Sequence, residues 1–188
     1  LKVVVSLATI FEELSIDYIL GGSLASSIHG IPRASQDADL VAALTIADIE
    51  PLLKAIEDDY YVDSGAVHEA IEQKRSFNII HLKTMFKIDV FVREIAGYIE
   101  QIFSRGESAE IIKGKSVYIY SPEDIILEKL DWYLKGGEVS DRQWQDVLGV
   151  MKVQDSRLDL KYLRMEAEKQ GLGRLLLQAM DQAGLDGG

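Results

Sequence analysis

Cysteine is absent from this 188-residue chain, and proline occurs only three times. Without cysteine the chain can form no disulfide, and it can supply no thiolate as a nucleophile or as a ligand for zinc or an iron–sulfur cluster. The prolines are isolated, and no proline- or serine-rich stretch separates two parts of the sequence. The length matches one domain, or one domain with a small addition, and is enough to bury a sizeable core.

Long apolar runs are also lacking. The run near the N-terminus, Val3–Phe11, is too short to span a bilayer, and Glu12 and Glu13 follow it directly. Its apolar residues fall on one stripe at helical spacing, so we interpret the run as an amphipathic helix rather than a signal sequence. We therefore expect no membrane contact and a cytoplasmic location.

Positive charge is scarce. The 31 acidic residues outnumber the 20 lysines and arginines, which gives a formal net charge of −11. Such a surface repels a phosphate backbone, so we expect no broad nucleic-acid-binding surface, although a local basic groove stays compatible with the composition.

Two parts of the sequence differ in their expected secondary structure. Residues 1–120 alternate between strand and helix patterns, whereas residues 121–188 are helical throughout. The second part begins at Ser121–Asp124 with a capping serine, a proline at the first helical position and acids in the first turn. The sequence predicts an α+β fold: a small mixed sheet with flanking helices at 1–120, followed by a C-terminal helical portion at 121–188.

Six segments carry strand patterns, and two of them are close enough to form an antiparallel hairpin. The hairpin joins Phe77–Leu82 to Phe86–Val92 through a three-residue connection. The six predicted strands are 16–20, 38–44, 77–82, 86–92, 109–112 and 116–120.

The most informative stretch combines a Gly-Gly-Ser turn with two aspartates on the next strand. Gly21, Gly22 and Ser23 lie between a predicted strand and a predicted helix, where glycines let the backbone approach a phosphate and the helix N-terminus offers N–H groups. Asp37 and Asp39 alternate along the following strand, so both carboxylates project from one face. Paired oxygen ligands of this kind suit Mg²⁺ or Mn²⁺ bound together with substrate phosphates. Each half alone is common at ordinary turns and strand edges, but their ordered combination favours phosphoryl or nucleotidyl transfer.

A third carboxylate interrupts a later apolar strand. Asp89 lies within Phe86–Val92, on the face that it shares with Lys87. A carboxylate in the middle of such a strand is costly unless it is paired or bound to a metal. An ion pair with Lys87 on a half-exposed sheet is one explanation. Because Asp37 and Asp39 are also present, we favour a metal site shared by all three aspartates. We therefore expect the three carboxylates to converge.

This combination resembles the DNA-polymerase-β-like nucleotidyltransferase superfamily. The fuller motif, Gly21–Leu40, is similar to that of the AbiEii/AbiGii-type branch, which includes toxins of type IV toxin–antitoxin systems. The second motif of that branch is a basic residue two positions before an acid, which Lys87 and Asp89 match. Its third motif is a lysine in a helix after the sheet, which Lys129 matches. The resemblance covers roughly residues 16–151.

The fourth motif of the branch is matched only in part. The branch has an arginine followed by a Lys-Asp pair at the start of a helix, and this chain has Arg142 and Asp146 with Gln145 in place of the lysine. A surface ion pair between Arg142 and Asp146, four residues apart on a helix, is the structural alternative. Arg33 either faces a triphosphate or pairs with an acidic residue. Without the resemblance, Lys129 would be interpreted as a solvent-exposed lysine.

The resemblance implies Mg²⁺-dependent transfer of a nucleoside monophosphate from an NTP to an acceptor, with release of pyrophosphate. It leaves the acceptor open between RNA, a protein and a small molecule, and it is compatible with a partner protein. The implied catalytic residues and metal ligands are Asp37, Asp39 and Asp89; the implied nucleotide-binding residues are Gly21, Gly22, Ser23, Arg33, Lys87 and Lys129; Asp146 is a further candidate.

Two other functions fit the same residues. A nucleotidyltransferase fold without activity can act as an antitoxin-like or regulatory subunit bound to a partner protein, which Gln145 and the lack of a basic surface favour. A metal-dependent phosphohydrolase can use the same carboxylates.

Overall fold

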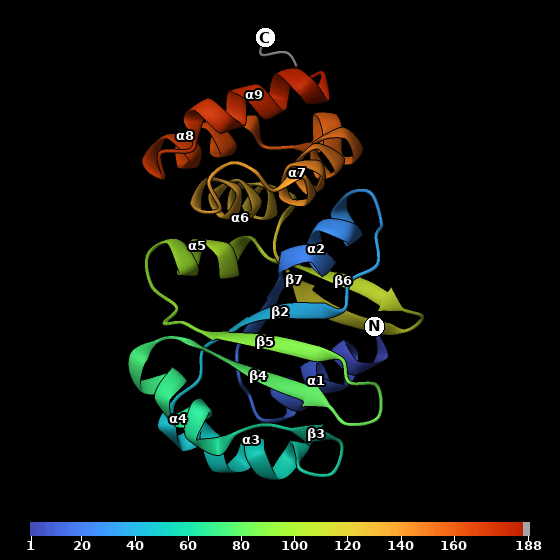
Figure 1. Cartoon of the computed structure of the whole chain (residues 1–188), viewed down its shortest axis with the longest axis vertical. Helices are drawn as coiled ribbons and strands as arrows, with labels where there is room; N and C mark the ends of the chain where they lie inside the picture. The colour runs from blue at the N-terminus through green and yellow to red at the C-terminus, as the bar shows by residue number, and fades with distance from the viewer. Residues whose placement is uncertain (186–188) are drawn as a thin grey trace. The chain divides into compact units, whose positions relative to one another are not determined.

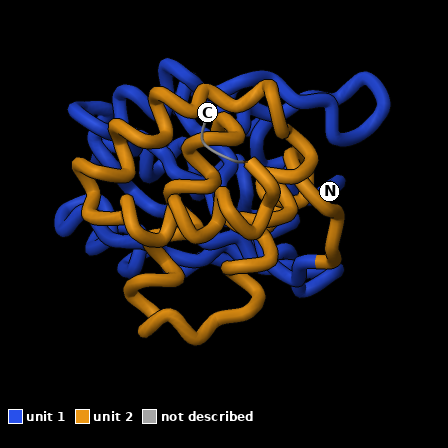
Figure 2. The backbone as a smooth tube through the Cα atoms, turned by 90° about the horizontal axis from the view of Figure 1, so that it is seen from above, with its two compact units in different colours: residues 1–21, 35–119 blue, residues 22–34, 120–188 orange. Residues whose placement is uncertain are grey.

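The computed structural model describes residues 1–185, and the chain forms two compact units. Unit 1 comprises residues 1–21 and 35–119, and unit 2 comprises residues 22–34 and 120–188 (Figure 2). Each unit is therefore built from two separate stretches of sequence. The segment 22–34, which carries part of the Gly-Gly-Ser motif, groups with the helical part of the chain.

Unit 1 contains a seven-stranded mixed sheet with the strand order β3-β4-β5-β2-β1-β7-β6 (Figure 1). Strand β2 pairs in parallel with β5, and β1 pairs in parallel with β7, whereas the other neighbours are antiparallel. The predicted hairpin is confirmed as β4–β5. The strands are β1 (Tyr18–Gly21), β2 (Asp37–Ala42), β3 (Tyr60–Tyr61), β4 (Ser76–His81), β5 (Lys87–Val92), β6 (Glu107–Ile112) and β7 (Lys115–Ile119).

One face of this sheet is apolar and buried because hydrophobic residues alternate along its central strands. Leu40, Ile79, Ile88 and Val90 are fully buried. Helix α4 packs against β4 and β5, and α1 packs against β7 and α3. The helices of unit 1 are α1 (Lys2–Glu13), α3 (Ile49–Ile56), α4 (Ser64–Gln73) and α5 (Tyr98–Arg105).

Unit 2 is helical, and α7 lies at its centre in contact with α2, α6 and α9. Its apolar stripe, which includes Trp144 and Met151, is buried as the sequence predicts. The helices of unit 2 are α2 (Gly22–His29), α6 (Pro122–Lys135), α7 (Asp141–Gln154), α8 (Leu160–Lys169) and α9 (Gly173–Ala183).

Three contacts explain why the segment 22–34 belongs to unit 2. A Cβ atom on Gly30 would lie 2.7 Å from the backbone nitrogen of Val150, so only glycine allows α2 to approach α7 this closely. The Nε2 atom of His29 lies 2.7 Å from the carbonyl oxygen of Tyr120, and the amide of Gln154 donates to the carbonyl oxygen of His29. His29 therefore links α2 to Tyr120 and to α7.

A helix that crosses a bilayer must be both long and apolar, and this applies to every helix within residues 1–185. None of them meets both requirements for crossing a membrane.

Candidate functional site

The polar face of the unit 1 sheet gathers four of the expected site residues. Asp39 and Asp89 are direct partners across the parallel β2–β5 pair, and Asp37 and Lys87 are the partners two residues earlier. Directly paired residues point to the same side of a sheet, so all four side chains share one face. All four are half-buried, between the buried residues of the opposite face. The sequence-based placement of the three aspartates on one face is confirmed.

Lys87 supplies positive charge to this face. Its ammonium nitrogen lies 2.6 Å from a carboxylate oxygen of Asp89. That hydrogen bond raises the pKa of Lys87 above its usual range, and the negative charges of Asp89, Asp37 and Asp39 act in the same direction. The ammonium is therefore within electrostatic reach of all three carboxylates. The hydroxyl of Ser35 donates to Asp37 at 2.8 Å.

Whether this face fits a divalent cation depends on its donors and their placement. Carboxylate oxygens are the ligands that Mg²⁺ and Mn²⁺ prefer, and the strand register places Asp39 beside Asp89. As the side chains stand, no three histidine, aspartate or glutamate side chains within residues 1–185 are arranged to hold a metal ion. Instead, Lys87 pairs with Asp89 and Ser35 with Asp37. The donor chemistry fits a cation, and its binding would require Lys87 to release Asp89.

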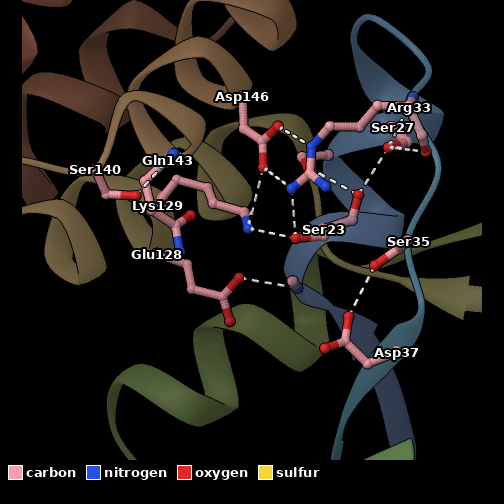
Figure 3. A network of polar contacts seen from close by, with 12 residues as sticks. Ser23, Ser27, Arg33, Ser35, Asp37, Glu128, Lys129, Ser140, Gln143 and Asp146 are labelled. Atoms are coloured by element: carbon pink, nitrogen blue, oxygen red, sulfur yellow. Dashed lines mark hydrogen bonds and ion pairs between the residues drawn. The ribbon is translucent and has the colours of Figure 1, made fainter. Parts of the chain in front are cut away.

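A second polar cluster lies entirely within unit 2 (Figure 3). The guanidinium of Arg33 donates two hydrogen bonds of 2.7 Å to the carboxylate of Asp146, and a third of 2.6 Å to the hydroxyl of Ser23. The ammonium of Lys129 lies 3.3 Å from Asp146 and 3.3 Å from the same serine hydroxyl. Ser23, at the start of α2, is thus held by two cations that one buried carboxylate orients.

Burial and charge act in opposite directions on Asp146. Burial alone would raise the pKa of its carboxyl group, but the hydrogen bond from Arg33 and the positive charges of Lys129 and Arg33 outweigh burial and lower the pKa below its usual value. Asp146 is therefore ionised at neutral pH.

Two structural alternatives raised by the sequence are wrong. Lys129 is only 2% exposed, so it is not a solvated lysine. Asp146 is buried and pairs with Arg33 and Lys129, whereas Arg142 is exposed on the same helix. The apolar residues around Lys129 in the sequence gave no indication that a partner carboxylate 17 positions later would bury it.

The first N–H group of α2 has an acidic partner. The amide of Gly22 donates a 2.9 Å hydrogen bond to a carboxylate oxygen of Glu128, one residue before Lys129 on α6. Gly22 has a φ of +61°, which favours glycine over residues with a Cβ. Sequence reasoning missed Glu128, although a carboxylate within a run of buried helical residues was an available signal. Glu128 therefore accepts the hydrogen bond from an N–H group that was expected to donate to a phosphate.

On the expectation that Gly22 binds a phosphate of an NTP, replacing Glu128 by glutamine should strengthen NTP binding about fivefold. The substitution removes a negative charge from the positive end of α2, where an anion gains about 1 kcal/mol, and the N–H of Gly22 becomes easier for a phosphate to take. Titration with a fluorescent ATP analogue measures the change in Kd. Asp131→Asn, a half-buried position on the same helix whose carboxylate pairs with Lys135, is the control and should leave the Kd unchanged. Weaker or unaltered binding by Glu128→Gln would show that Gly22 does not contact the nucleotide.

The expected site residues thus form two clusters, one in unit 1 and one in unit 2. Gly21 lies in unit 1, next to the cluster of that unit, because it pairs with Asp39 across β1 and β2. Gln145 and Arg142 of the incomplete fourth motif are exposed on α7. The cluster in unit 1 contains Asp37, Asp39, Lys87 and Asp89, and the cluster in unit 2 contains Gly22, Ser23, Arg33, Lys129 and Asp146.

Comparison with solved structures identifies the fold. The structure of ANT(2″)-Ia in complex with adenylyl-2″-tobramycin matches with a TM-score of 0.61 and 15% identity, over 90% of this chain and 97% of that one. A nucleotidyltransferase-like protein from Paracoccidioides brasiliensis matches with a TM-score of 0.57 and 20% identity, over 96% and 91% of the two chains. The lincosamide antibiotic adenylyltransferase LnuA in its lincomycin-bound form matches with a TM-score of 0.53 and 11% identity, over 77% and 92%. At these identities the likeness shows a nucleotidyltransferase fold.

Comparison of the sequence itself gives a family. Residues 7–155 match the model of the nucleotidyl transferase AbiEii toxin family, of type IV toxin–antitoxin systems. No curated protein sequence matches significantly. The matched range covers the whole of unit 1 from β1 onward and the part of unit 2 that contains the Ser23–Asp146 cluster.

Proposed function

The chain belongs to the AbiEii family of nucleotidyl transferases, and we propose that it transfers a nucleoside monophosphate from an NTP to an acceptor with Mg²⁺ or Mn²⁺ as its cofactor. One observation carries the metal-dependent part of this proposal. Asp39 and Asp89 are paired across two parallel strands, Asp37 lies on the same face, and Lys87 is within reach of all three charges. Three carboxylates concentrated on one sheet face need a compensating cation, and their oxygens suit a hard divalent one.

The residues of unit 1 carry the chemistry in this proposal. When bound, the metal ions would neutralise charge on the phosphates and activate the acceptor hydroxyl. Asp37 and Asp39 would hold the metal ions, and Asp89 would hold one of them and take the proton from the acceptor hydroxyl at its carboxylate oxygen. The acceptor oxygen forms a bond to the α-phosphorus, and the bond from that phosphorus to pyrophosphate breaks, so pyrophosphate leaves. Lys87 exchanges its contact with Asp89 for one with a phosphate oxygen.

The residues of unit 2 hold the phosphates in this proposal. Once Glu128 releases it, the N–H group of Gly22 donates to the β- and γ-phosphates together with the hydroxyl of Ser23, and Lys129 and Arg33 offset their charge. Asp146 keeps the two cations in one orientation, as their 2.7 to 3.3 Å contacts support. Positioned charges of this kind supply most of the rate enhancement in phosphoryl transfer.

The family suggests a biological setting as well. Membership of a toxin family of type IV toxin–antitoxin systems supports a role as the toxin of such a pair, with a partner protein as its antitoxin. The acceptor could be RNA, a protein or a small molecule.

Incubation with each α-³²P-labelled NTP, Mg²⁺ and a desalted lysate of the source organism tests the proposal. We expect one or more NTPs to label a lysate component, with pyrophosphate released in equal amount and with all transfer abolished by EDTA. Mg²⁺ and that NTP together should also raise the melting temperature, because they bind the folded state alone. Binding of NTP without any labelling would favour the alternative of a non-catalytic module, and labelling that resists EDTA would exclude the metal.

A further inference from the structure

The row of residues that contains Asp39 and Asp89 continues across the sheet to a residue that the reaction scheme has not used. Gly21 pairs with Asp39, Asp39 with Asp89, and Asp89 with Asn78, so the four lie side by side on β1, β2, β5 and β4. Neighbouring strands are about 4.8 Å apart, which places Asn78 one strand spacing beyond Asp89, on the side away from Asp39.

The side chain of Asn78 is available at this position. Asn78 alternates with the buried residues Phe77 and Ile79 of β4, so it points to the same face as Asp89, and it is exposed. Within residues 1–185 the Asn78 side chain makes no hydrogen bond. Its amide therefore offers one acceptor oxygen and two donor hydrogens next to Asp89.

Asparagine does not favour the strand conformation that β4 adopts at this position. It is depleted in strands, whereas threonine and other β-branched residues are favoured at exposed strand positions. Asn78 is also the only asparagine in the chain. Asn78 is thus a residue that neither the strand nor the core requires, and it lies beside a carboxylate of the candidate site.

We propose that Asn78 is an acceptor-binding residue whose amide hydrogen-bonds the acceptor and holds its reacting hydroxyl at Asp89. This inference rests on the proposed function, in which Asp37 and Asp39 serve the nucleotide side of Asp89. The opposite flank of Asp89 is then the acceptor side. There, Ser76 is exposed and pairs with the half-buried Phe91, two residues beyond Asp89 on β5, so the same face offers a hydroxyl. The guanidinium of Arg93 lies over the Phe91 ring, 6.0 Å from its centroid.

The test separates acceptor use from nucleotide binding in two variants, Asn78→Thr and Asn78→Ala. The probes are an α-³²P-labelled NTP and a dilution series of desalted lysate. We expect both variants to need at least tenfold more lysate for half-maximal labelling, while the KM for the NTP stays within twofold. We also expect Asn78→Thr to melt at the same temperature as the wild type or higher, because threonine suits an exposed strand better. Ser116→Ala, an exposed change on β7, is the control and should alter none of these quantities.

Each other outcome counts against one of the two proposals. If the variants reach half-maximal labelling at the wild-type lysate concentration, Asn78 does not bind the acceptor, and the proposed function stands. If the KM for the NTP rises as much as the lysate requirement, Asn78 serves the nucleotide or the sheet, and the acceptor assignment is wrong. If wild-type protein labels nothing, the proposed function itself fails, and the inference fails with it.

Discussion

Replacing Asp89 by asparagine should reduce nucleotide transfer by roughly 10³-fold while weakening NTP binding only slightly. Asparagine keeps the size of the side chain but removes the metal ligand and proton acceptor of the proposed function, both of which would act mainly in the transition state. In the proposed function, Asp37, Asp39 and the phosphate-binding residues still bind the nucleotide. Label transfer at saturating NTP measures the loss, and a titration with a fluorescent NTP measures binding.

The chain provides a closely matched control for this substitution. Asp59 also pairs with a lysine on unit 1, because the ammonium of Lys83 lies 2.8 Å from its carboxylate, and both partners are exposed. Asp59→Asn therefore removes the same charge from the same kind of ion pair away from the candidate site. It should leave transfer unchanged, since exposed pairs contribute about 1 kcal/mol or less to stability. An equal loss in the two variants, or full activity in Asp89→Asn, would contradict the assigned role.

Local patterns in the sequence predicted much of the fold. Alternation of apolar residues identified the strands, and the Ser121 cap, whose hydroxyl accepts from the amide of Asp124, marked the start of α6 as expected. The two-residue strand β3 escaped notice because Tyr60–Tyr61 is too short to show a period. The parallel pairing of β2 with β5 and the grouping of 22–34 with unit 2 depend on contacts between residues far apart in the chain, which no local pattern encodes.

The candidate site also combines features that local patterns predict with features that depend on contacts between distant residues. Period-two alternation suffices to place Asp37 and Asp39 on one face, and the basic residue before Asp89 already suggested the Lys87 pair. The hydrogen bonds from Lys129 to Ser23 and from Gly22 to Glu128 could not be predicted, because each joins residues about a hundred positions apart. Asn78 gave no signal in the sequence, since only the register of β4 against β5 places it beside Asp89.

Replacing Asp146 by asparagine should lower the free energy of unfolding by about 3 kcal/mol. Its side chain is 6% exposed and that of Lys129 is 3% exposed, while Arg33 is 26% exposed. Removal of one charge from a buried cluster leaves the other charges poorly solvated, which costs more than breaking an exposed pair. Urea unfolding at neutral pH measures the loss. Arg142→Gln, an exposed change on the same helix, is the control and should change stability by less than about 0.5 kcal/mol.

Acid should reduce the difference in the free energy of unfolding between the wild type and Asp146→Asn. Because Arg33 and Lys129 lower the pKa of Asp146, its carboxylate stabilises the fold at every pH above the unfolded-state pKa, about 3.9. That contribution is lost as the pH falls through the lower pKa of the folded state, whereas the asparagine variant has no such contribution to lose. The gap in unfolding free energy should therefore be full at neutral pH and shrink below about pH 3.9. A gap that stays constant through this range would mean that the lost stability came from packing around Asp146, and that its charge does not hold Arg33 and Lys129 in place.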